Sequence, residues 1–518
     1  MRTEVIKANI VVFIASFCTL VIELVAGRIM APYVGVSLYT WTSIIGVVLA
    51  GISIGAYLGG LLADRSPRAS TLGWLLFLSG LGAFSISPLT NMVGPAHFQT
   101  TLMLRILLIT AIIFFVPSCL LGMISPVVVK LTLHNLDKTG NVVGKIYAFS
   151  TLGSILGTFA TGFYLISRMG TRNILFTMGI ILVLSALVFG GFFTKKKILI
   201  PILILLTGFL WGIHGYAFKF PLDEETYFYK ESDYYTIKLK KKERGDGGPL
   251  EALVLDHLIH SYTDLTDPFY FEYEYIRIYE EIVRWQAARR GPFKVLFLGG
   301  GGYTFPRFIE TKYPEAGIEV VEIDPEVTRV VYEYLGIPKG TKIRTFNEDA
   351  RWFLMNSKGG GRYDFIFGDA FNDLSIPYHL TTKEFALQLK RVLKPDGLLM
   401  ANVIDSFKAG LFMPSYIRTL EEVFGKENVH LLTLTSDYDH IGISTNVIVA
   451  SPQKLDMGDF VRTIQGKNEN EMVAHVMPQE RLQRYLTEHP SIILTDDYVP
   501  VDNLIAPIFE ERFGYGNQ

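Results

Sequence analysis

Long apolar stretches dominate the first 217 residues of the chain. Each is close to the twenty or so residues that an α-helix needs to cross a bilayer. They cover roughly residues 9–30, 41–62, 72–90, 103–129, 146–167, 173–193 and 198–217. Small residues recur at close helical spacing in segments such as GVVLAGISIGAYLGG, and such faces let membrane helices approach closely. We therefore predict an α-helical transmembrane bundle of about seven spans over residues 1–217.

The charges between the apolar stretches predict an orientation. Basic residues fall in alternate loops, at Arg65, Lys130 and 195–197, and the positive-inside rule then places the N-terminus in the cytoplasm. Seven crossings from there would leave the C-terminal half outside the cell, which is awkward for an enzyme that uses a cytosolic nucleotide. We expect a multi-pass protein of the cell (inner) membrane, and the side on which the C-terminal half lies stays open.

After residue 217 the pattern of the chain changes from continuous apolar runs to alternation. Alternating polar and apolar residues flank the glycine-rich turn 245–248, which is typical of a hairpin. We predict a small antiparallel β domain over 218–285, which includes the start of a helix near 271–289. Strand and helix patterns then alternate to about residue 450, which indicates a doubly wound, mostly parallel sheet. We assign 286–518 to this α/β, Rossmann-like methyltransferase-type domain.

Composition narrows the classes of function. The 518 residues include 48 basic and 50 acidic ones, so the net charge of -2 gives no general attraction to nucleic acid. The 2 cysteines, Cys18 and Cys119, lie in apolar runs, which excludes a disulfide scaffold and cysteine-ligated zinc. His257 and His260 lack a third ligand at useful spacing, so we predict no metal.

A glycine turn follows the first strand of the predicted parallel sheet. The apolar run 295–298 leads into Gly299, Gly300, Gly301 and Gly302. Thr304 stands where the dinucleotide fingerprint would have its last glycine, which disfavours NAD. A wider turn without lysine suits an S-adenosylmethionine-type ligand, which has no pyrophosphate to hold.

Carboxylates stand at the ends of the next three strands. Glu322 and Asp324 follow one strand, Glu348 and Asp349 the next, and Asp369 ends the run YDFIFGD. Open α/β sheets bind ligands at this edge, and a cationic sulfonium ligand favours an acidic pocket. Some of these carboxylates also have a structural interpretation. Glu348 and Asp349 are placed to cap a helix that begins at residue 350.

These motifs resemble the polyamine aminopropyltransferases, or spermidine synthases. ESDYYTIKL and LVLDHLIHSY match the β region of that family, and VLFLGGGG, VVEID, NEDA and YDFIFGDAF match its nucleotide site in order. The whole chain resembles the bacterial membrane-bound form, a multi-span helical domain fused to a spermidine-synthase-like domain. GRIMAPYVGVSLYTW and GGLLADR are similar to the membrane part of that form.

The resemblance implies a donor, an acceptor and a role for each site residue. The donor would be decarboxylated S-adenosylmethionine and the acceptor a polyamine such as putrescine. Asp369 would be the general base, Glu322 would take the ribose and Asp349 the adenine. The donor site would also include Gly299, Gly300, Gly301, Asp324 and Glu348, and the acceptor site His260, Tyr273, Glu274, Asn372 and Asp373.

Departures from the family pattern fall mainly on the groups that hold amines. Gly302 stands where the family has an aspartate that holds the aminopropyl amine of the donor, which removes a reason to prefer the decarboxylated donor. His260 replaces a glutamine, and Asn372 a second aspartate, with Asp373 one residue late.

Three functions follow from these observations. The first is aminopropyl transfer to a putrescine-like amine. The second, motivated by Gly302, is methyl or aminocarboxypropyl transfer from intact S-adenosylmethionine. The third is a membrane polyamine transporter or sensor, motivated by Glu23 and Arg28 inside the first apolar stretch. Expected partners are a small amine, the lipid bilayer and a second copy in a homodimer, with no nucleic acid.

Overall fold

A computed structural model describes residues 2–96, 98, 100–133, 139–191, 208, 221–370, 376–438, 441–465 and 472–512. Contacts divide the chain into two compact units. The first comprises residues 1–223 with 231–233, and the second comprises 224–230 with 234–518.

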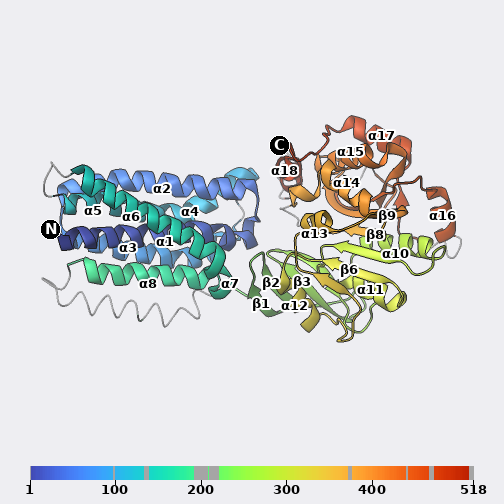
Figure 1. Cartoon of the computed structure of the whole chain (residues 1–518), viewed down its shortest axis with the longest axis horizontal. Helices are drawn as coiled ribbons and strands as arrows, with labels where there is room; N and C mark the ends of the chain where they lie inside the picture. The colour runs from blue at the N-terminus through green and yellow to red at the C-terminus, as the bar shows by residue number, and fades with distance from the viewer. Residues whose placement is uncertain are drawn as a thin grey trace. The chain divides into compact units, whose positions relative to one another are not determined.

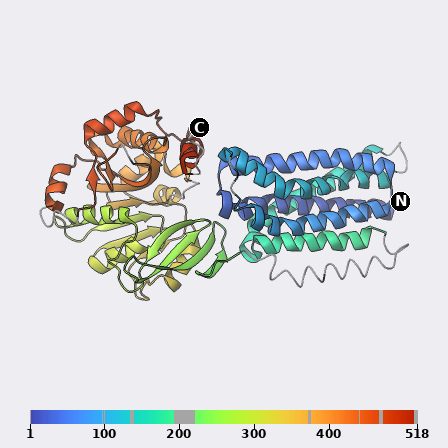
Figure 2. The same ribbon diagram turned by 180° about the vertical axis from the view of Figure 1, so that it is seen from behind.

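The first unit is a bundle of long apolar helices that lie side by side (Figures 1 and 2). Within the described part of the chain, six helical stretches are long and apolar enough to cross a membrane: 4–34, 38–65, 69–93, 102–132, 139–169 and 171–189. The first six predicted stretches are thus confirmed as helices, and the seventh, 198–217, lies outside the described residues apart from Gly208. The elements are α1 (Arg2–Val34), α2 (Leu38–Arg65), α3 (Ala69–Val93), α4 (Leu102–Gly122), α5 (Ile124–Thr132), α6 (Thr139–Ala160), the π-turn Thr161–Leu165, α7 (Ile166–Met169) and α8 (Thr171–Phe189).

Glycines let pairs of these helices approach at backbone distance. A Cβ added to Gly55 of α2 would collide with the carbonyl group of Cys119 of α4, and one added to Gly153 of α6 would collide with the carbonyl of Phe13 of α1. The small-residue faces seen in the sequence therefore lie at helix contacts, where van der Waals packing holds the bundle.

The second unit begins with a four-stranded antiparallel sheet, in the order β1-β2-β3-β4. Its strands are β1 (Thr226–Glu231), β2 (Thr236–Glu243), β3 (Pro249–Leu255) and β4 (Leu258–Thr263). β2 pairs antiparallel with β3 from Ile237 opposite Leu255 to Glu243 opposite Pro249. The turn closes with a hydrogen bond from the N–H of Arg244 to the carbonyl of Gly248, 2.7 Å long, which confirms the predicted hairpin.

The larger sheet of this unit has eight strands in the order β12-β10-β11-β9-β8-β5-β6-β7. The strands from β9 to β7 in this order are parallel, whereas β11 is antiparallel to β9, and β10 to both β11 and β12. This topology confirms the predicted Rossmann-like α/β fold, with an antiparallel edge added. The strands are β5 (Lys294–Leu298), β6 (Gly317–Val321), β7 (Arg344–Phe346), β8 (Tyr363–Gly368), β9 (Leu393–Ser406), β10 (Val429–Thr433), β11 (Ile443–Ala450) and β12 (His475–Val476).

Helices cover both faces of this sheet, with α14 and α15 on one side and α10 and α11 on the other (Figures 1 and 2). The core packs apolar residues of α10 and α11 against β5 and β8, with Phe297 and Phe367 at its centre. The helices are α10 (Glu274–Ala287), α11 (Thr304–Lys312), α12 (Pro325–Tyr334), α13 (Ala350–Asn356), the 3-10 turn Tyr378–Leu380, α14 (Lys383–Val392), α15 (Phe412–Phe424), the 3-10 turn Lys426–Asn428, α16 (Met457–Gln465), α17 (Gln479–Glu488) and α18 (Val501–Arg512).

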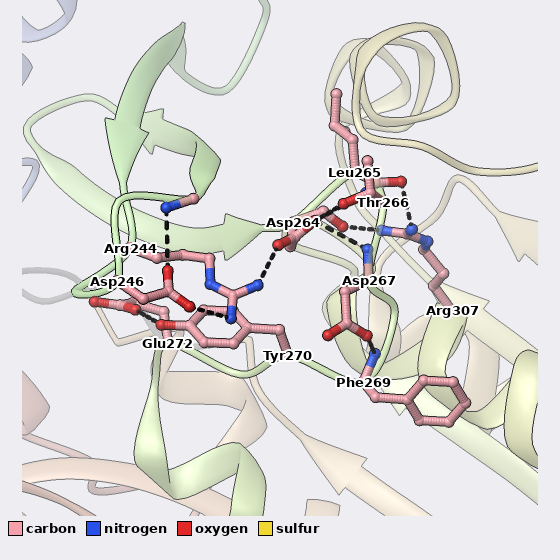
Figure 3. Close-up of polar contacts among 11 residues, drawn as sticks. Arg244, Asp246, Asp264, Leu265, Thr266, Asp267, Phe269, Tyr270, Glu272 and Arg307 are labelled. Atoms are coloured by element: carbon pink, nitrogen blue, oxygen red, sulfur yellow. Dashed lines mark hydrogen bonds and ion pairs between the residues drawn. The ribbon is translucent and has the colours of Figure 1, made fainter.

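A polar network joins the small sheet to α11 (Figure 3). Arg307 of α11 donates to the carbonyls of Asp264, at 2.6 Å, and Leu265, at 2.8 Å. Arg244 donates to the Asp264 carboxylate at 2.9 Å and lies over the ring of Tyr270. Burial opposes ionisation of Asp264, but hydrogen bonds from Thr266, the backbone and Arg244 outweigh it and lower its pKa to about 2. This network fixes β4 beside the start of α11, and so beside the glycine turn.

Candidate active site

The carboxyl ends of β8, β5, β6 and β7 lie next to one another at one edge of the larger sheet. The residues after these ends come together through backbone hydrogen bonds. The N–H of Asp369 donates to the carbonyl of Leu298 at 3.0 Å, and that of Gly299 to the carbonyl of Val321 at 2.9 Å. Gly299 has a φ of +94°, and a Cβ there would lie 2.5 Å from the carbonyl oxygen of Asp369. Glycine is therefore required where the turn touches the end of β8.

Two cavities open at this edge. The small cavity, of about 140 Å³, is lined by residues of the β6 and β7 ends and by Pro377, His379 and Leu380. The large cavity, of about 450 Å³, lies between β4, α10, the glycine turn and the ends of β9 and β11. Four residues line both: His260, Gly299, Gly301 and Asp369. A group transferred from a ligand in one cavity to a ligand in the other would pass Asp369.

Two neutral donors hold the carboxylate of Asp369. The hydroxyl of Tyr275 donates to its Oδ2 at 2.9 Å, and the side-chain amide of Asn402 to its Oδ1 at 2.8 Å. Burial raises the pKa of Asp369, and the two hydrogen bonds oppose that rise because they favour the ionised form. Asp369 is thus a fixed carboxylate with a raised pKa, the property of a general base that works near neutral pH.

Glu322 stands in the small cavity and binds the glycine turn. Its Oε2 accepts the N–H of Gly300 at 2.8 Å and its Oε1 that of Asp324 at 3.0 Å. Burial raises the pKa of Glu322, although the backbone N–H groups oppose the rise. The side chain of Asp324 itself caps α12 by accepting the N–H of Glu326, at 2.9 Å, and is absent from the described lining of both cavities.

Asp349 caps a helix and also lines the small cavity. Its Oδ1 caps α13 by accepting the N–H of Trp352 at 2.9 Å, and the residue also lines the small cavity. Its Oδ2 lies 2.7 Å from Nε2 of His379, which lines the same cavity. Glu348 lines it as well, so one acidic wall of the small cavity comes from the end of β7.

Only some of the predicted acceptor residues lie at the large cavity. His260 and Tyr273 line the large cavity, and the hydroxyl of Tyr273 donates to the carbonyl of Ile259 at 2.7 Å. Glu274, the first residue of α10, is exposed and is absent from the described lining. Asn372 and Asp373 lie outside the described residues. Among the residues that the structure describes, no group of three potential ligands could hold a metal ion.

The sequence did not predict three residues of this site: Tyr275, Asn402 and His379. Tyr275 precedes Tyr279 by one helical turn in EYIRIYEE, which indicates an aromatic stripe and by itself suggests core packing. Asn402 offered a clearer signal, because it is a polar residue in the apolar strand LLMANVI. Nothing in the sequence near His379 indicated that it would face Asp349.

Ser261 occupies the space where residue 302 would carry a side chain. A Cβ added to Gly302 would lie 2.0 Å from the Oγ of Ser261. Ser261 is buried, lines the large cavity, and its Oγ has no hydrogen-bond partner. The neutral hydroxyl of Ser261 in β4 therefore stands beside the turn, and a residue 302 with a side chain would require Ser261 to shift.

The geometry defines a Rossmann-like domain with a buried carboxylate, that of Asp369, where two cavities meet. Comparison with known proteins shows which proteins the chain resembles. The family model of the spermine/spermidine synthase domain matches residues 279–445. A polyamine aminopropyltransferase of Vibrio vulnificus is 36% identical over 118 residues, which cover 23% of this chain and 40% of that protein. Polyamine aminopropyltransferase 2 of Aquifex aeolicus is 24% identical over 424 residues, covering 79% of this chain and 82% of that protein.

Two further comparisons cover part of this chain. The human eEF1A lysine and N-terminal methyltransferase is 27% identical over 150 residues, which cover 25% of this chain and 22% of that protein. A crystal structure of a probable spermidine synthase from Corynebacterium glutamicum superimposes with a TM-score of 0.46 at 22% identity, over 54% of this chain and 99% of that chain. The chain thus contains a spermidine synthase domain and is a homologue of the polyamine aminopropyltransferases. It spans less than half the length of the Vibrio relative.

Proposed function

We propose that the protein is a polyamine aminopropyltransferase, which moves an aminopropyl group from decarboxylated S-adenosylmethionine to a putrescine-like amine. The observation that carries the proposal is the position of Asp369, held by Tyr275 and Asn402 where the two cavities meet. The family match supports the same chemistry.

The residues suggest how the reaction would proceed. The adenosyl part of the donor fits the small cavity, where Glu322 and Asp349 offer acceptors for ribose hydroxyls and for the adenine amine. The amine nitrogen attacks the propyl carbon attached to sulfur; a C–N bond forms, and the C–S bond breaks with its electron pair going to sulfur. Sulfur becomes a neutral thioether, and the attacking nitrogen releases a proton to Asp369. General bases of this kind contribute about 10²–10⁴-fold to a rate.

A second candidate is transfer from intact S-adenosylmethionine. Gly302 and the hydroxyl of Ser261 favour it, because no carboxylate at residue 302 selects an amine over an amino acid on the donor. The similarity to a methyltransferase over 150 residues is compatible with it. The third candidate, a transporter or sensor, gives no reason for a base at Asp369.

We also propose that the six apolar helices cross the cell membrane, as multi-pass spans, and that the soluble unit forms a homodimer. The length and hydropathy of the helices support the first proposal. A reporter enzyme fused to the C-terminus, active on one side of the membrane only, would place the soluble unit.

The function is tested with detergent-purified full-length protein, putrescine and either donor, with products identified by mass spectrometry. Spermidine from the decarboxylated donor is the expected result. Methylated or aminocarboxypropylated product would favour transfer from intact S-adenosylmethionine instead. Binding without turnover would favour a transporter or sensor. Asp369→Asn is expected to abolish turnover while calorimetry shows donor binding unchanged; full activity in this variant would remove Asp369 as the base.

A further inference from the structure

A segment after α17 lies along the elements that form one wall of the small cavity. We call residues 494–498 the strap. The carbonyl of Leu494 accepts the N–H of Lys383, 2.8 Å away, and the N–H of Asp496 donates to the carboxylate of Glu384 at 2.9 Å. The backbone of the strap is therefore held against the first turn of α14.

The side chain of Asp496 joins the strap to two elements. Its Oδ1 accepts the hydroxyl of Thr382, the N-cap of α14, at 2.7 Å, and Nη1 of Arg351 in α13, also at 2.7 Å. Its Oδ2 accepts Nη2 of Arg351, so the guanidinium binds the carboxylate through two hydrogen bonds. These bonds lower the pKa of Asp496, which keeps it ionised near neutral pH. A two-point contact of this kind fixes the direction of the arginine as well as its position.

Arg351 passes this restraint on to the cavity wall. Its Nη1 also donates to the carbonyl of His379 at 3.1 Å. The imidazole of the same residue lies 2.7 Å from the carboxylate of Asp349, and both His379 and Asp349 line the small cavity. The backbone of His379 is thus tied to Arg351 and its side chain to Asp349. Asp496 orients the arginine through the strap.

The position of this wall matters for an adenosyl ligand. Asp349 and His379 offer polar atoms to the ligand, and hydrogen bonds weaken steeply when their geometry departs from the optimum. If Arg351 lost its partner in the strap, its side chain would gain freedom and the carbonyl of His379 would lose a fixed donor. A ligand would then have to order the wall as it binds, and that ordering costs affinity.

We propose that the strap is a positioning element for the donor, in which Asp496 acts through Arg351 to hold the wall of the small cavity in the shape that binds the adenosyl group. The proposal rests on the donor site proposed above, and it adds an element outside the described lining of that site on which donor affinity depends. Because coupling between two sites is reciprocal, a bound nucleoside should also hold the strap in place.

Binding of 5′-methylthioadenosine to the full-length protein, measured by calorimetry, tests the first half of the proposal. This thioether is what remains of the donor once the aminopropyl group has left. Asp496→Asn keeps the shape of the side chain and removes its charge. The variant should bind the nucleoside about threefold to fivefold more weakly, which is the range that an ion pair of this exposure can supply. A Kd within about twofold of the parent would overturn the proposal.

Glu422→Gln is the matched control. Glu422 forms an ion pair with Lys383 of the same α14 at 2.9 Å, and its side chain is 45% exposed, against 41% for Asp496. The control therefore removes one partly exposed charge pair from α14 without changing the contact to Arg351. We expect its Kd to equal that of the parent. An equal weakening in Glu422→Gln and Asp496→Asn would overturn the proposal.

A double variant tests whether Asp496 acts through the arginine. Arg351→Gln should weaken binding of the nucleoside about tenfold, because it also removes the donor to the carbonyl of His379. Adding Asp496→Asn to this variant should change the Kd no further, since the partner through which it acts is already lost. Additive losses would show that Asp496 acts by another route and would overturn the relay.

Two further readouts distinguish positioning from a general loss of structure. Asp496→Asn should raise the KM of the donor by the same factor as the Kd and leave kcat within about twofold, because Asp369 is held by Tyr275 and Asn402 instead. In the parent, saturating 5′-methylthioadenosine should slow cleavage by chymotrypsin after the exposed Tyr498 about threefold to fivefold. A fall in kcat with an unchanged KM, or cleavage that ignores the nucleoside, would overturn the proposal.

These outcomes differ from a failure of the proposed function. If the nucleoside binds and protects the strap but no aminopropyl group is transferred with either donor, the transfer fails while the role of the strap stands. If the group is transferred and Asp496→Asn binds the nucleoside as tightly as the parent, the transfer stands and this proposal fails. Absence of nucleoside binding in the parent would remove the adenosyl site and this proposal with it.

Discussion

Replacement of Tyr275 by phenylalanine should move the acid limb of the pH–rate profile. Tyr275 is buried, and its hydroxyl donates to Asp369 at 2.9 Å. Tyr275→Phe keeps the ring, which packs against Tyr279 at 5.6 Å, and removes only the hydroxyl. The change therefore acts on the ionised carboxylate, because that form gains most from a hydrogen-bond donor.

The size and sign of the shift follow from this hydrogen bond. A hydrogen bond to a charged group contributes about 1.5–3 kcal/mol, and one pKa unit corresponds to about 1.4 kcal/mol. Burial raises the pKa of Asp369 and Tyr275 lowers it, so loss of Tyr275 should raise the pKa further, by about 1–2 units. A base works only when ionised. As the pH is lowered, the activity of the variant should therefore begin to fall at a higher pH than that of the parent. In alkaline buffer the activity of the variant should recover.

The assay is the pH dependence of kcat/KM, with one donor and one amine for all variants. The ionisation of the amine contributes equally to each profile and cancels in the comparison. Tyr279→Phe is the matched control, since Tyr279 lies one helical turn further on, is buried, and its hydroxyl has no hydrogen-bond partner. We expect no shift of the acid limb in that control.

A uniform loss of rate without a shift would refute the reasoning. If Tyr275→Phe lowers kcat/KM equally at every pH, the tyrosine supports the shape of the site and does not tune Asp369. A shift of similar size in Tyr279→Phe would likewise remove the hydrogen bond as the cause.

Three further outcomes are expected. Glu322→Gln should weaken the binding of 5′-methylthioadenosine, measured by calorimetry, at least about tenfold, because Glu322 accepts two backbone N–H groups beside the small cavity. An unchanged Kd would exclude a role of Glu322 in binding the nucleoside. Gly302→Asp should lower the free energy of unfolding by about 1–3 kcal/mol, since its Cβ would meet Ser261, and the added change Ser261→Gly should restore most of the Tm; no recovery would mean another clash. Asp496, which follows α17, forms an ion pair with Arg351 of α13, and the pair is partly exposed and contributes at most about 1 kcal/mol, so Asp496→Ala should leave Tm nearly unchanged yet hasten proteolysis around residue 496; equal cleavage rates would show that the ion pair does not hold this segment in place.

The edge of the sheet was predictable because its information is local. Gly299, Glu322 and Asp369 each come directly after a strand in the sequence. Parallel strands bring their carboxyl ends to one edge of the sheet. The alternation of strands and helices and the hairpin before them follow from the same short-range patterns, whereas the spatial order of the strands does not. Such residues can be predicted without knowledge of contacts that are distant in the sequence.

The side chains that hold Asp369 were not predictable in the same way. Tyr275 and Asn402 come from α10 and β9, far along the chain from β8, and only the tertiary packing brings them to one carboxylate. Glu274 shows how sensitive such assignments are. One residue along a helix rotates the side chain by about 100°, so Glu274 is exposed while Tyr275 is buried against Asp369.

Capping and ligand binding use the same atoms of aspartate, which limits what a motif can reveal. Asp324 and Asp349 both begin helices after strand ends, and both accept a backbone N–H there. Only Asp349 also lines the small cavity. The local sequence does not encode this difference, since both residues follow a strand end and begin a helix.

The backbone contact at Gly299 has a consequence for redesign of the protein. No side chain can be inserted there as a spacer, since both the φ of +94° and the carbonyl of Asp369 oppose it. Substitutions that change the surroundings of Asp369 therefore have to be placed elsewhere, for example at Phe297 and Phe367, which pair across β5 and β8 and stack with their centroids 4.6 Å apart. Directed evolution aimed at larger nucleophiles should begin with that pair of rings, because both line the large cavity together with Asp369.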